Sequence, residues 1–505
     1  MKNLNFKIVL QYVFGALLLV LTVVSCTDLE PTFDDSVPAE DSSGAFAGID
    51  PTNFLESAYN DIEGMGDQAN TYALLEVSSD ELVVLTRGAD WGDNGIWRTM
   101  HQHAWSREHP HILNAWNNRN AAVFRCNQII APESNASPAQ LAQAKALRAL
   151  NMFYVMDFFG QVPFRGVNEG VEVDPMVMTR AEAFDFIVQD LTDALPDLAS
   201  ANLSDIYTVN KAFANFLLAK LYLNKEIYTG SVDATDYTRV VEFCDAVTAE
   251  GYTLDADYFG IFIPGHMNQE IILALDTGTS NRVWNILHPN QGGWNGFATL
   301  GEVYDSFEPN DIRLGEPSTD GLGTGMLIGQ QYDINGEKIR DRGGNELVFT
   351  KDFPKGISGN NERTGVRPHK YTKINLDQDL QMTDPEVKLE PGNGNVLARY
   401  ADVVLMKAEA IMRGGTSGET AESILDNLRT LRGATASGSY TMDDLLEERR
   451  RELWIEGWRR NDQIRFGTFT SAWDLKDNTE DFRVLFPIPA AAVATNPNLT
   501  QNPGY

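Results

Sequence analysis

The feature that most constrains the fold of this chain is a series of helical segments that follow one another in neighbouring pairs. Thr179 and Glu182 have the spacing of a capping box, the run behind them is apolar at helical spacing, and Pro196 ends it. Further helices are predicted from Ser137-Pro138 through 141–159, at 211–224, 237–250, 396–412 and 421–431, and from Thr441 to about 456.

These pairs predict a mainly α fold. A pair of roughly 35 to 45 residues cannot bury its own apolar face, so such pairs stack on their neighbours, as in tetratricopeptide (TPR) arrays. The segments share no repeating consensus, so periodicity alone leaves the TPR-like arrangement open.

Two regions interrupt the helical pattern. One spans residues 65–111, and the other spans about 260–390 and is rich in Gly, Asn, Asp and Pro, with a β-like piece at Glu270 to Leu275. A loop-rich stretch of this length inside a compact protein is usually a binding region or a small subdomain. We therefore expect a partly β, loop-rich region beside the helices.

The N-terminus has the features of a lipoprotein signal. Lys2 and Lys7 precede an apolar run from Ile8 to Val24, and Ser25-Cys26 follows it. A small residue directly before a Cys predicts cleavage after residue 25 and acylation of the Cys26 thiol. An ordinary signal peptide with a chance Cys is the alternative, and a spanning helix is less favoured because the run is at the short limit for a bilayer.

Charge is unevenly distributed along the chain. Residues 27–86 contain fourteen Asp and Glu and no Lys or Arg, so residues 26–50 are predicted to be an acidic, flexible tether and 51–505 the folded domain. The net charge of −31 argues against nucleic acid and anionic lipid surfaces as partners. Cys126 and Cys244 are interpreted as buried free thiols, with a disulfide as the alternative.

Five segments, in order, resemble motifs of the SusD/RagB family of surface nutrient-binding lipoproteins. They are KALRALNMFYVMDFFGQVPF (145–164), FANFLLAKLYLN (213–224), RYADVVLMKAEA (399–410), ERRRELWIEGWRRNDQIRFG (448–467) and LFPIPAAAVATNPNLTQNPGY (485–505). The chain departs from the family pattern at Trp458, where His is common, and at 461–463.

The resemblance implies several properties. The fold would consist of four TPR-like helix pairs that support an irregular ligand-binding part, a SusD-like α-α superhelix. The protein would be anchored in the outer membrane, face the outside of the cell, and bind a glycan or similar nutrient. Its partner would be a SusC-type TonB-dependent outer-membrane barrel, on which it would sit as a lid.

Aromatic residues in the irregular regions are the best ligand candidates. Indole faces match the apolar faces of sugar rings, and nearby Arg, Asn and Asp can bond the hydroxyls. Indoles that anchor loops are the alternative, which is favoured for Trp105 and Trp116. The predicted ligand-binding residues are Trp91, Trp97, Trp284, Trp294, Arg87, Asp90 and Asn94.

Other clusters are interpreted as structural. The Glu- and Arg-rich segment 447–456 is predicted to form ion pairs that pin neighbouring helices. His101, His103, His109 and His111 could bind a metal, but their spacing is not helical and no metal or other cofactor is predicted.

The sequence predicts binding without catalysis. It contains no Gly-x-Ser-x-Gly elbow, no HExxH and no phosphate loop. A structural TPR-like adaptor without its own ligand stays open as an alternative. An extracellular glycan hydrolase also stays open, since two carboxylates suffice for that chemistry.

Overall fold

The computed structural model describes residues 45–170, 172–263, 268–277, 280–333, 335–371 and 394–505. The predicted signal peptide, Cys26 and most of the predicted tether lie outside these ranges. Within them, no helix is both long enough and apolar enough to span a bilayer.

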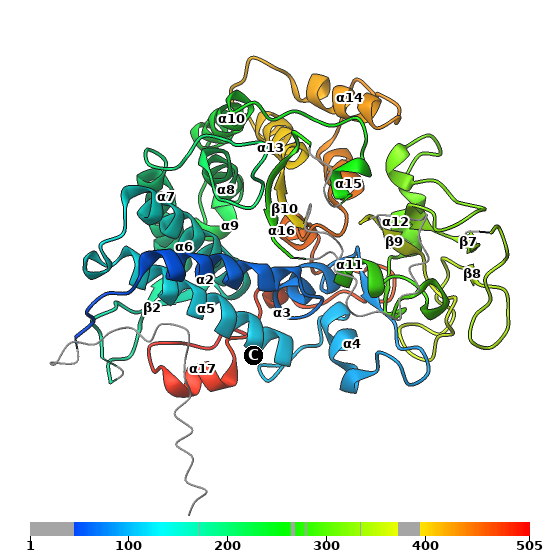
Figure 1. Cartoon of the computed structure of the whole chain (residues 1–505), viewed down its shortest axis with the longest axis horizontal. Coiled ribbons are helices and arrows are strands. Elements are labelled where there is room, and N and C mark those ends of the chain that lie inside the picture. Colours follow the sequence, from blue (N-terminus) through cyan, green and yellow to red (C-terminus); the bar gives the residue numbers. More distant parts are fainter. Residues whose placement is uncertain (1–44, 171, 264–267, 278–279, 334, 372–393) are drawn as a thin grey trace, which may run out of the picture.

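The longer helices form an arc that runs from the centre of the molecule around one side and over the top (Figure 1). Each helix packs on the next in the order α2, α5, α6, α7, α8, α10, α13, and α13 also packs on α14 and α15. These helices are α2 (Pro51–Glu63), α5 (Pro110–Ile130), α6 (Pro138–Phe159), α7 (Arg180–Ala194), α8 (Lys211–Leu223), α10 (Ala234–Ala249), α13 (Tyr400–Met412), α14 (Ala421–Leu431) and α15 (Met442–Leu453).

Shorter helices lie inside the arc and on its open side, except α17, which lies below α5 (Figure 1). The short helices are α3 (Asn70–Tyr72), α4 (Ile96–His101), α9 (Lys225–Thr229), α11 (Ser280–Trp284), α12 (Gly301–Asp305), α16 (Arg459–Arg465) and α17 (Ala490–Thr495). A π-helical turn, Ala73–Val77, follows α3 directly.

The predicted helix ends agree with the structure at the caps. Thr179 and Glu182 form a complete capping box at the start of α7, and Ser137 and Gln140 form one at the start of α6. Gly160 ends α6 in the left-handed conformation, with φ of 70°.

The helix predicted at 396–412 is wrong in its first four residues. Asn395–Arg399 is a strand, β10, and the helix begins only at Tyr400. Its antiparallel partner is β4, Ile271–Leu275, which the sequence did indicate as β-like. Both strands are buried along their whole length, so their continuous apolar pattern does not distinguish strand from helix.

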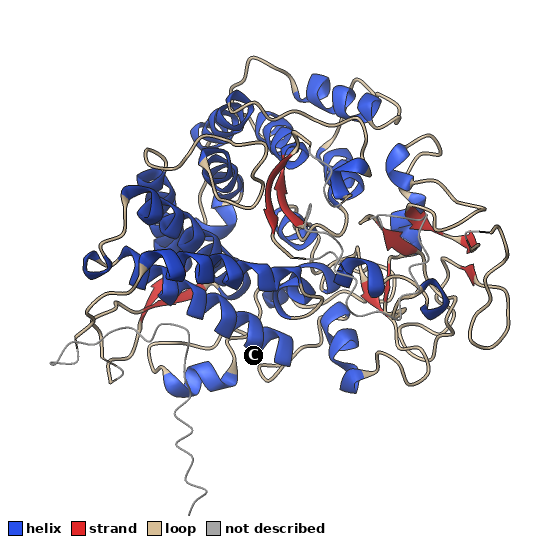
Figure 2. Ribbon diagram, in the orientation of Figure 1, coloured by secondary structure: helices blue, strands red, loops and turns tan. Residues whose placement is uncertain are grey.

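The remaining strands form small two-stranded sheets, mostly on the open side of the arc (Figure 2). They are β1 (Val83–Val84) with β5 (Phe297–Ala298), β2 (Gln161–Phe164) with β3 (Met176–Thr179), β6 (Gly325–Leu327) with β9 (Arg367–His369), and β7 (Gly329–Gln330) with β8 (Val348–Phe349). The pairing of β1 with β5 joins the two irregular regions that the sequence predicted separately.

The last residues of the predicted tether are packed against the folded domain. Phe46 is buried, and its N–H donates to Asn168 Oδ1. A Cβ at Gly48 would lie 2.2 Å from the carbonyl oxygen of Glu133, so this backbone passes close to its neighbour. The folded domain therefore begins at least five residues before Pro51.

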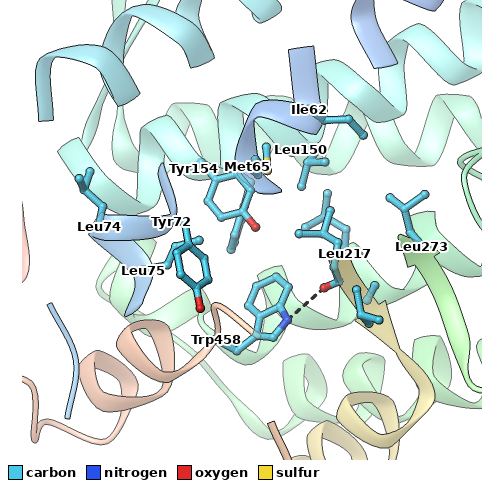
Figure 3. Close-up of a cluster of buried hydrophobic side chains, with 14 of the residues drawn as sticks. Ile62, Met65, Tyr72, Leu74, Leu75, Leu150, Tyr154, Leu217, Leu273 and Trp458 are labelled. Atoms are coloured by element: carbon cyan, nitrogen blue, oxygen red, sulfur yellow. Dashed lines mark hydrogen bonds between the residues drawn. The ribbon is translucent and has the colours of Figure 1, made fainter. Parts of the chain in front are cut away.

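Trp458 lies in a cluster of buried hydrophobic side chains (Figure 3). It is 3% exposed, its Nε1 donates to the carbonyl oxygen of Leu397 at 3.1 Å, and Lys220 Nζ lies 4.2 Å from the ring centroid. Tyr72, Tyr154 and Leu217 lie around it from three different helices. An indole at position 458 thus fills a space shared by the first and last parts of the chain.

The Arg-rich helix α15 is a structural ion network, as the sequence predicted. Arg449 is fully buried between Asp402 of α13 and Asp462 of α16, at 2.8 and 2.7 Å. These two carboxylates, with Glu409, outweigh the effect of burial and raise the pKa of Arg449 above its usual value. The guanidinium therefore stays charged and fixes three helices to one another.

Glu452 is the second centre of this network. Its carboxylate accepts hydrogen bonds from three buried guanidinium groups, those of Arg313, Arg399 and Arg432, at 2.9, 2.7 and 2.9 Å. Burial alone would raise the pKa of Glu452, but the three cations outweigh it and hold the pKa well below its usual value. One carboxylate thus compensates charge from three separate segments.

We predict that Glu452→Gln strongly destabilises the fold. The neutral amide leaves three buried guanidinium groups with less compensation, and breaking a buried ion pair costs about 3–5 kcal/mol. Urea unfolding should show this loss. Glu422→Gln, a matched change on the exposed face of α14, should stay within about 0.5 kcal/mol of the wild type. Equal stabilities of the two variants would contradict the assigned role.

Candidate functional site

An open cleft of about 520 Å³ lies on the loop-rich side, where the two irregular regions meet. It is lined by Asp90, Trp91, Asp93, Pro289, Gly293, Trp294 and Arg342. The structure thus brings together three residues that the sequence predicted as ligand-binding, namely Asp90, Trp91 and Trp294. They come from loops about 200 positions apart, which the β1–β5 pairing holds side by side.

Trp294 presents the most accessible aromatic face of this cleft. It is 51% exposed, although large apolar side chains are usually buried. Trp284 supports it from behind, with ring centroids 5.5 Å apart and planes inclined at 44°. Trp284 is half-buried, so it contributes mainly by holding the Trp294 ring.

Trp91 forms the second aromatic side of the cleft and locks the two loops together. Its Nε1 donates to the carbonyl oxygen of Trp294 at 2.7 Å, and its ring packs against Trp97 and Phe297. Its φ is 58°, a left-handed conformation that is costly for a bulky residue. The surrounding contacts must therefore compensate this strain, which keeps the indole in one position.

Gly296 is required for this arrangement. A Cβ at this position would lie 2.3 Å from the Trp91 ring, closer than any real Cβ contact. The indole therefore lies directly on the backbone of Gly296. Sequence patterns indicated a turn here but gave no reason for glycine at this position.

Trp97 is placed differently from its predicted role as a ligand contact. It is only 5% exposed, and its Nε1 donates to Asp93 Oδ2 at 2.7 Å. Its ring lies against Trp91, Phe297 and His111. The structure assigns Trp97 to the support of Trp91 instead of the cleft surface.

Arg87 is also a supporting residue in this structure. It is 4% exposed, and its guanidinium donates to the carbonyl oxygens of Asn295, Asn361 and Thr364 at 2.6–2.7 Å. Burial lowers its pKa to about 9, and Glu362 partly offsets this effect. Arg87 therefore holds the loop that carries Trp294 and does not line the cleft.

A second buried guanidinium, that of Arg367, completes this support. It donates to the carbonyl oxygens of Thr364, Gly365 and Glu362 and to Asn295 Oδ1, and it stacks on Phe349. Two cations thus bind the carbonyl groups of one turn. Because these groups would otherwise be buried without partners, the turn beneath the cleft is fixed in shape.

The rim of the cleft carries an ion pair between separate loops. Arg342 Nη2 donates to Asp90 Oδ2 at 2.7 Å, and its Nε and backbone N–H both donate to Glu362. Burial would raise the pKa of Glu362, but hydrogen bonds from His288 and Arg342 outweigh it and lower the pKa to about 2. Burial lowers the pKa of His288, so this side chain is neutral at pH 7.

Asn94, the last predicted residue, and several unpredicted residues lie at or beside the cleft. Asn94 is exposed beside the cleft with φ of 52°, a left-handed conformation that Asn tolerates, and it is not among the lining residues. Four lining residues were not predicted, namely Asp93, Pro289, Gly293 and Arg342. The first three lie beside or between predicted residues in the sequence, whereas nothing near Arg342 resembles a binding motif and only the fold brings it to Trp91.

The four histidines at 101–111 are buried in the core. His101 and His103 contact carbonyl oxygens of Leu82 and Ser78, and His109 contacts that of Ile96. Burial lowers the pKa of all four. Among the described residues, no group of three or more His, Cys, Asp or Glu side chains is arranged to hold a metal ion.

A second cavity, of about 580 Å³, lies at the other end of the molecule between α5, the β2–β3 hairpin and α17. Its lining is mostly aliphatic and amide side chains, including Leu113, Asn120 and Leu499. It is slightly larger than the cleft, but it lacks an exposed indole and a paired acid and base. The cleft at Trp294 is therefore the better candidate for a specific polar ligand.

Comparisons with known proteins agree on one family. Residues 277–483 match the model of the SusD family. The chain is 27% identical over 419 residues to the starch-binding protein SusD of Bacteroides thetaiotaomicron, covering 72% of this chain and 73% of that protein.

Solved structures show the same fold over nearly the whole chain. A SusD superfamily protein from Parabacteroides distasonis superposes with a TM-score of 0.69 at 21% identity, covering 90% of this chain and 98% of that one. Surface glycan-binding protein A of B. thetaiotaomicron, solved with laminarihexaose, gives 0.67 at 19% identity and the same coverages. The predicted mainly α, SusD-like fold is confirmed.

We predict that Gly296→Ala displaces the Trp91 indole. The added Cβ overlaps the ring, and overpacking of this kind costs about 1–3 kcal/mol. Near-ultraviolet circular dichroism should change in the tryptophan region, and urea unfolding should occur at lower concentration. Gly92→Ala in the same loop is the control, because the nearest atom to its Cβ lies 3.9 Å away. A wild-type spectrum for Gly296→Ala would contradict the assignment.

Proposed function

We propose that this chain, which matches the model of the SusD family over residues 277–483, captures an oligosaccharide or similar nutrient at the cell surface and delivers it to a SusC-type TonB-dependent transporter. The observation that carries the proposal is the cleft formed by Trp91 and Trp294, in which an exposed indole stands beside an acid and a base. The predicted mechanism is capture without chemical change.

The cleft suits a sugar for physical reasons. The Trp294 face can cover the apolar C–H face of a sugar ring, and the Asp90–Arg342 pair offers an acceptor and a donor at its rim. The supporting residues Trp97, Arg87 and Arg367 fix these groups before a ligand arrives. A preformed site of this kind loses little conformational entropy on binding.

The relatives support binding over catalysis. One is named a starch-binding protein, and another was solved with laminarihexaose. Both are named for binding, in agreement with the prediction that the protein is not an enzyme. Since these two relatives are associated with different glucans, the shared fold does not specify the sugar of this chain.

The proposal places the protein in the outer membrane, facing outward, with acyl chains on Cys26. The support is the apolar run followed by Ser25-Cys26 and the acidic segment behind it. Each buried methylene stabilises the attachment by ~0.8 kcal/mol, so two or more chains give lasting anchorage.

The transporter partner rests on the family resemblance. A structural adaptor without its own ligand is the second candidate, and it predicts co-purification with the barrel but no glycan binding. The exposed Trp294 favours the first candidate, because an adaptor has no need of an uncovered indole above a fixed turn.

We predict that Trp294→Ala weakens glycan binding by about tenfold or more. Stacking that buries roughly 60 Å² of apolar surface at ~25 cal/mol per Å² stabilises by ~1.5 kcal/mol. Starch, laminarin and a glycan array should first identify the ligand, and calorimetry should then compare the proteins. Ile312→Ala removes another exposed apolar side chain and should bind normally. Unchanged affinity in Trp294→Ala would overturn the site assignment.

We predict that Cys26→Ser abolishes membrane attachment in the native host. The hydroxyl cannot take the thioether-linked lipid, so mass spectrometry should find no acyl groups and fractionation should move the protein out of the outer membrane. Cys126→Ala changes a buried thiol and should leave attachment intact. Membrane-bound, acylated Cys26→Ser protein would refute the anchor.

A further inference from the structure

The charged groups that line the cleft are mostly acidic. Asp90 and Asp93 line it directly, and Arg342 is the single cationic residue in the described lining. The side chains of Asp90 and Arg342 are about half exposed, at 48% and 50%. A ligand that reaches Trp294 therefore meets two carboxylates and one guanidinium.

Arg342 is already neutralised on two sides. It pairs with Asp90 at 2.7 Å and with the carboxylate of Glu362, which is held in its charged form by the same contact and by His288. An anionic ligand group at the remaining N–H donors of this guanidinium would gain little attraction, because Asp90 and Glu362 already compensate the charge of Arg342. Such a group would also be repelled by the Asp90 carboxylate beside it.

The two buried arginines beneath the cleft do not provide an anion site. The described hydrogen bonds of Arg87 run to the carbonyl oxygens of Asn295, Asn361 and Thr364, and those of Arg367 run to carbonyls and to Asn295 Oδ1. Both side chains are at most 4% exposed. Their hydrogen-bonded N–H groups therefore serve the turn they support, and neither residue lines the cleft.

The Asp90–Arg342 pair itself matches neutral sugar chemistry. Only Oδ2 of Asp90 accepts a hydrogen bond within the described part of the chain, which leaves Oδ1 available as an acceptor. The guanidinium next to it carries further N–H donors. Adjacent hydroxyl groups on a sugar can donate to the first and accept from the second, so one diol can satisfy both without breaking the ion pair.

We propose that this cleft selects uncharged oligosaccharides, that Asp90 and Arg342 bind adjacent hydroxyls of a ring stacked on Trp294, and that Asp90 and Asp93 exclude carboxylated and sulfated glycans. The proposal rests on the proposed function, because it specifies the ligand class of the same site. The net charge of −31 also disfavours anionic glycans, over a longer range.

The expected size of the effect follows from Coulomb's law. Repulsion of a ligand anion by one carboxylate about 5 Å away lowers the affinity by roughly 5- to 150-fold for effective dielectric constants between about 80 and 20. A discrimination of about tenfold is therefore expected at low salt. Salt should reduce it, since the Debye length falls from about 30 Å at 0.01 M to about 3 Å at 1 M.

The test compares one glycan in neutral and charged form. After a panel of starch, laminarin and other neutral glycans has identified the tightest neutral ligand, its sulfated and C6-carboxylated derivatives are titrated by calorimetry at low and high salt. The full-length mature protein is used. We expect the derivatives to bind at least about tenfold more weakly at low salt, with a smaller difference at high salt.

Two variants test whether the lining carboxylates, and not the shape of the cleft, cause the discrimination against anionic glycans. Asp90→Asn with Asp93→Asn removes both lining charges, and the amide oxygen introduced at position 93 can still accept from Trp97 Nε1. The ratio of neutral to anionic affinity should fall several-fold in this double variant. Asp443→Asn, an exposed change on α15, should leave the ratio unchanged.

The outcomes distinguish charge selection from glycan capture. Anionic derivatives that bind as tightly as the neutral glycan, or a ratio unaltered by the double variant, would overturn the charge selection while leaving glycan capture intact. Failure of every neutral and anionic glycan to bind the wild type would overturn the proposed function and this inference together.

Discussion

Buried ion pairs around α15 and α16 are the interactions on which the rest of the structure depends. Arg449 and Glu452 are each surrounded by oppositely charged groups from segments that are distant in the sequence. Removing charges from water costs several kcal/mol per ion, so these groups are tolerated only when every partner is in place. The planar, multiply donating guanidinium suits this task better than an ammonium group does. The network therefore favours one arrangement of the helices over compact alternatives.

The same network positions the cleft. Asp80 is held by Arg459 of α16, and Glu81 accepts from the backbone N–H of Ile455 in the turn between α15 and α16, so both residues are fixed to this C-terminal part of the chain. Strand β1 starts two residues later, pairs with β5, and leads into the loop that carries Asp90 and Trp91. Strand β5 follows Gly296 and the Trp294 turn directly. The rigid helical arc is thus connected to both aromatic loops by one short pair of strands.

The sequence predicted the structure correctly where the deciding interactions lie within one helical turn. The capping boxes at Thr179 and Thr441 satisfy backbone groups within one turn, so the helix starts could be located without a structure. The helix prediction was wrong at 396–399 because the conformation of this segment depends on pairing with β4, more than 120 positions earlier. Trp97 and Arg87 were expected at a surface because their neighbours are turn formers. Their burial depends on Asn295, Asn361 and Phe297, which only the completed fold brings to them. Arg342 had no local signal at all.

The ion pairs that join the two ends of the chain also impose an order in time. Asp80 and Arg459 are 379 positions apart, and Asp157 and Arg460 are 303 apart. A ribosome therefore makes both carboxylates long before it makes their partners, and a growing chain cannot compensate them in a closed core. Final folding waits for the last tenth of the polypeptide.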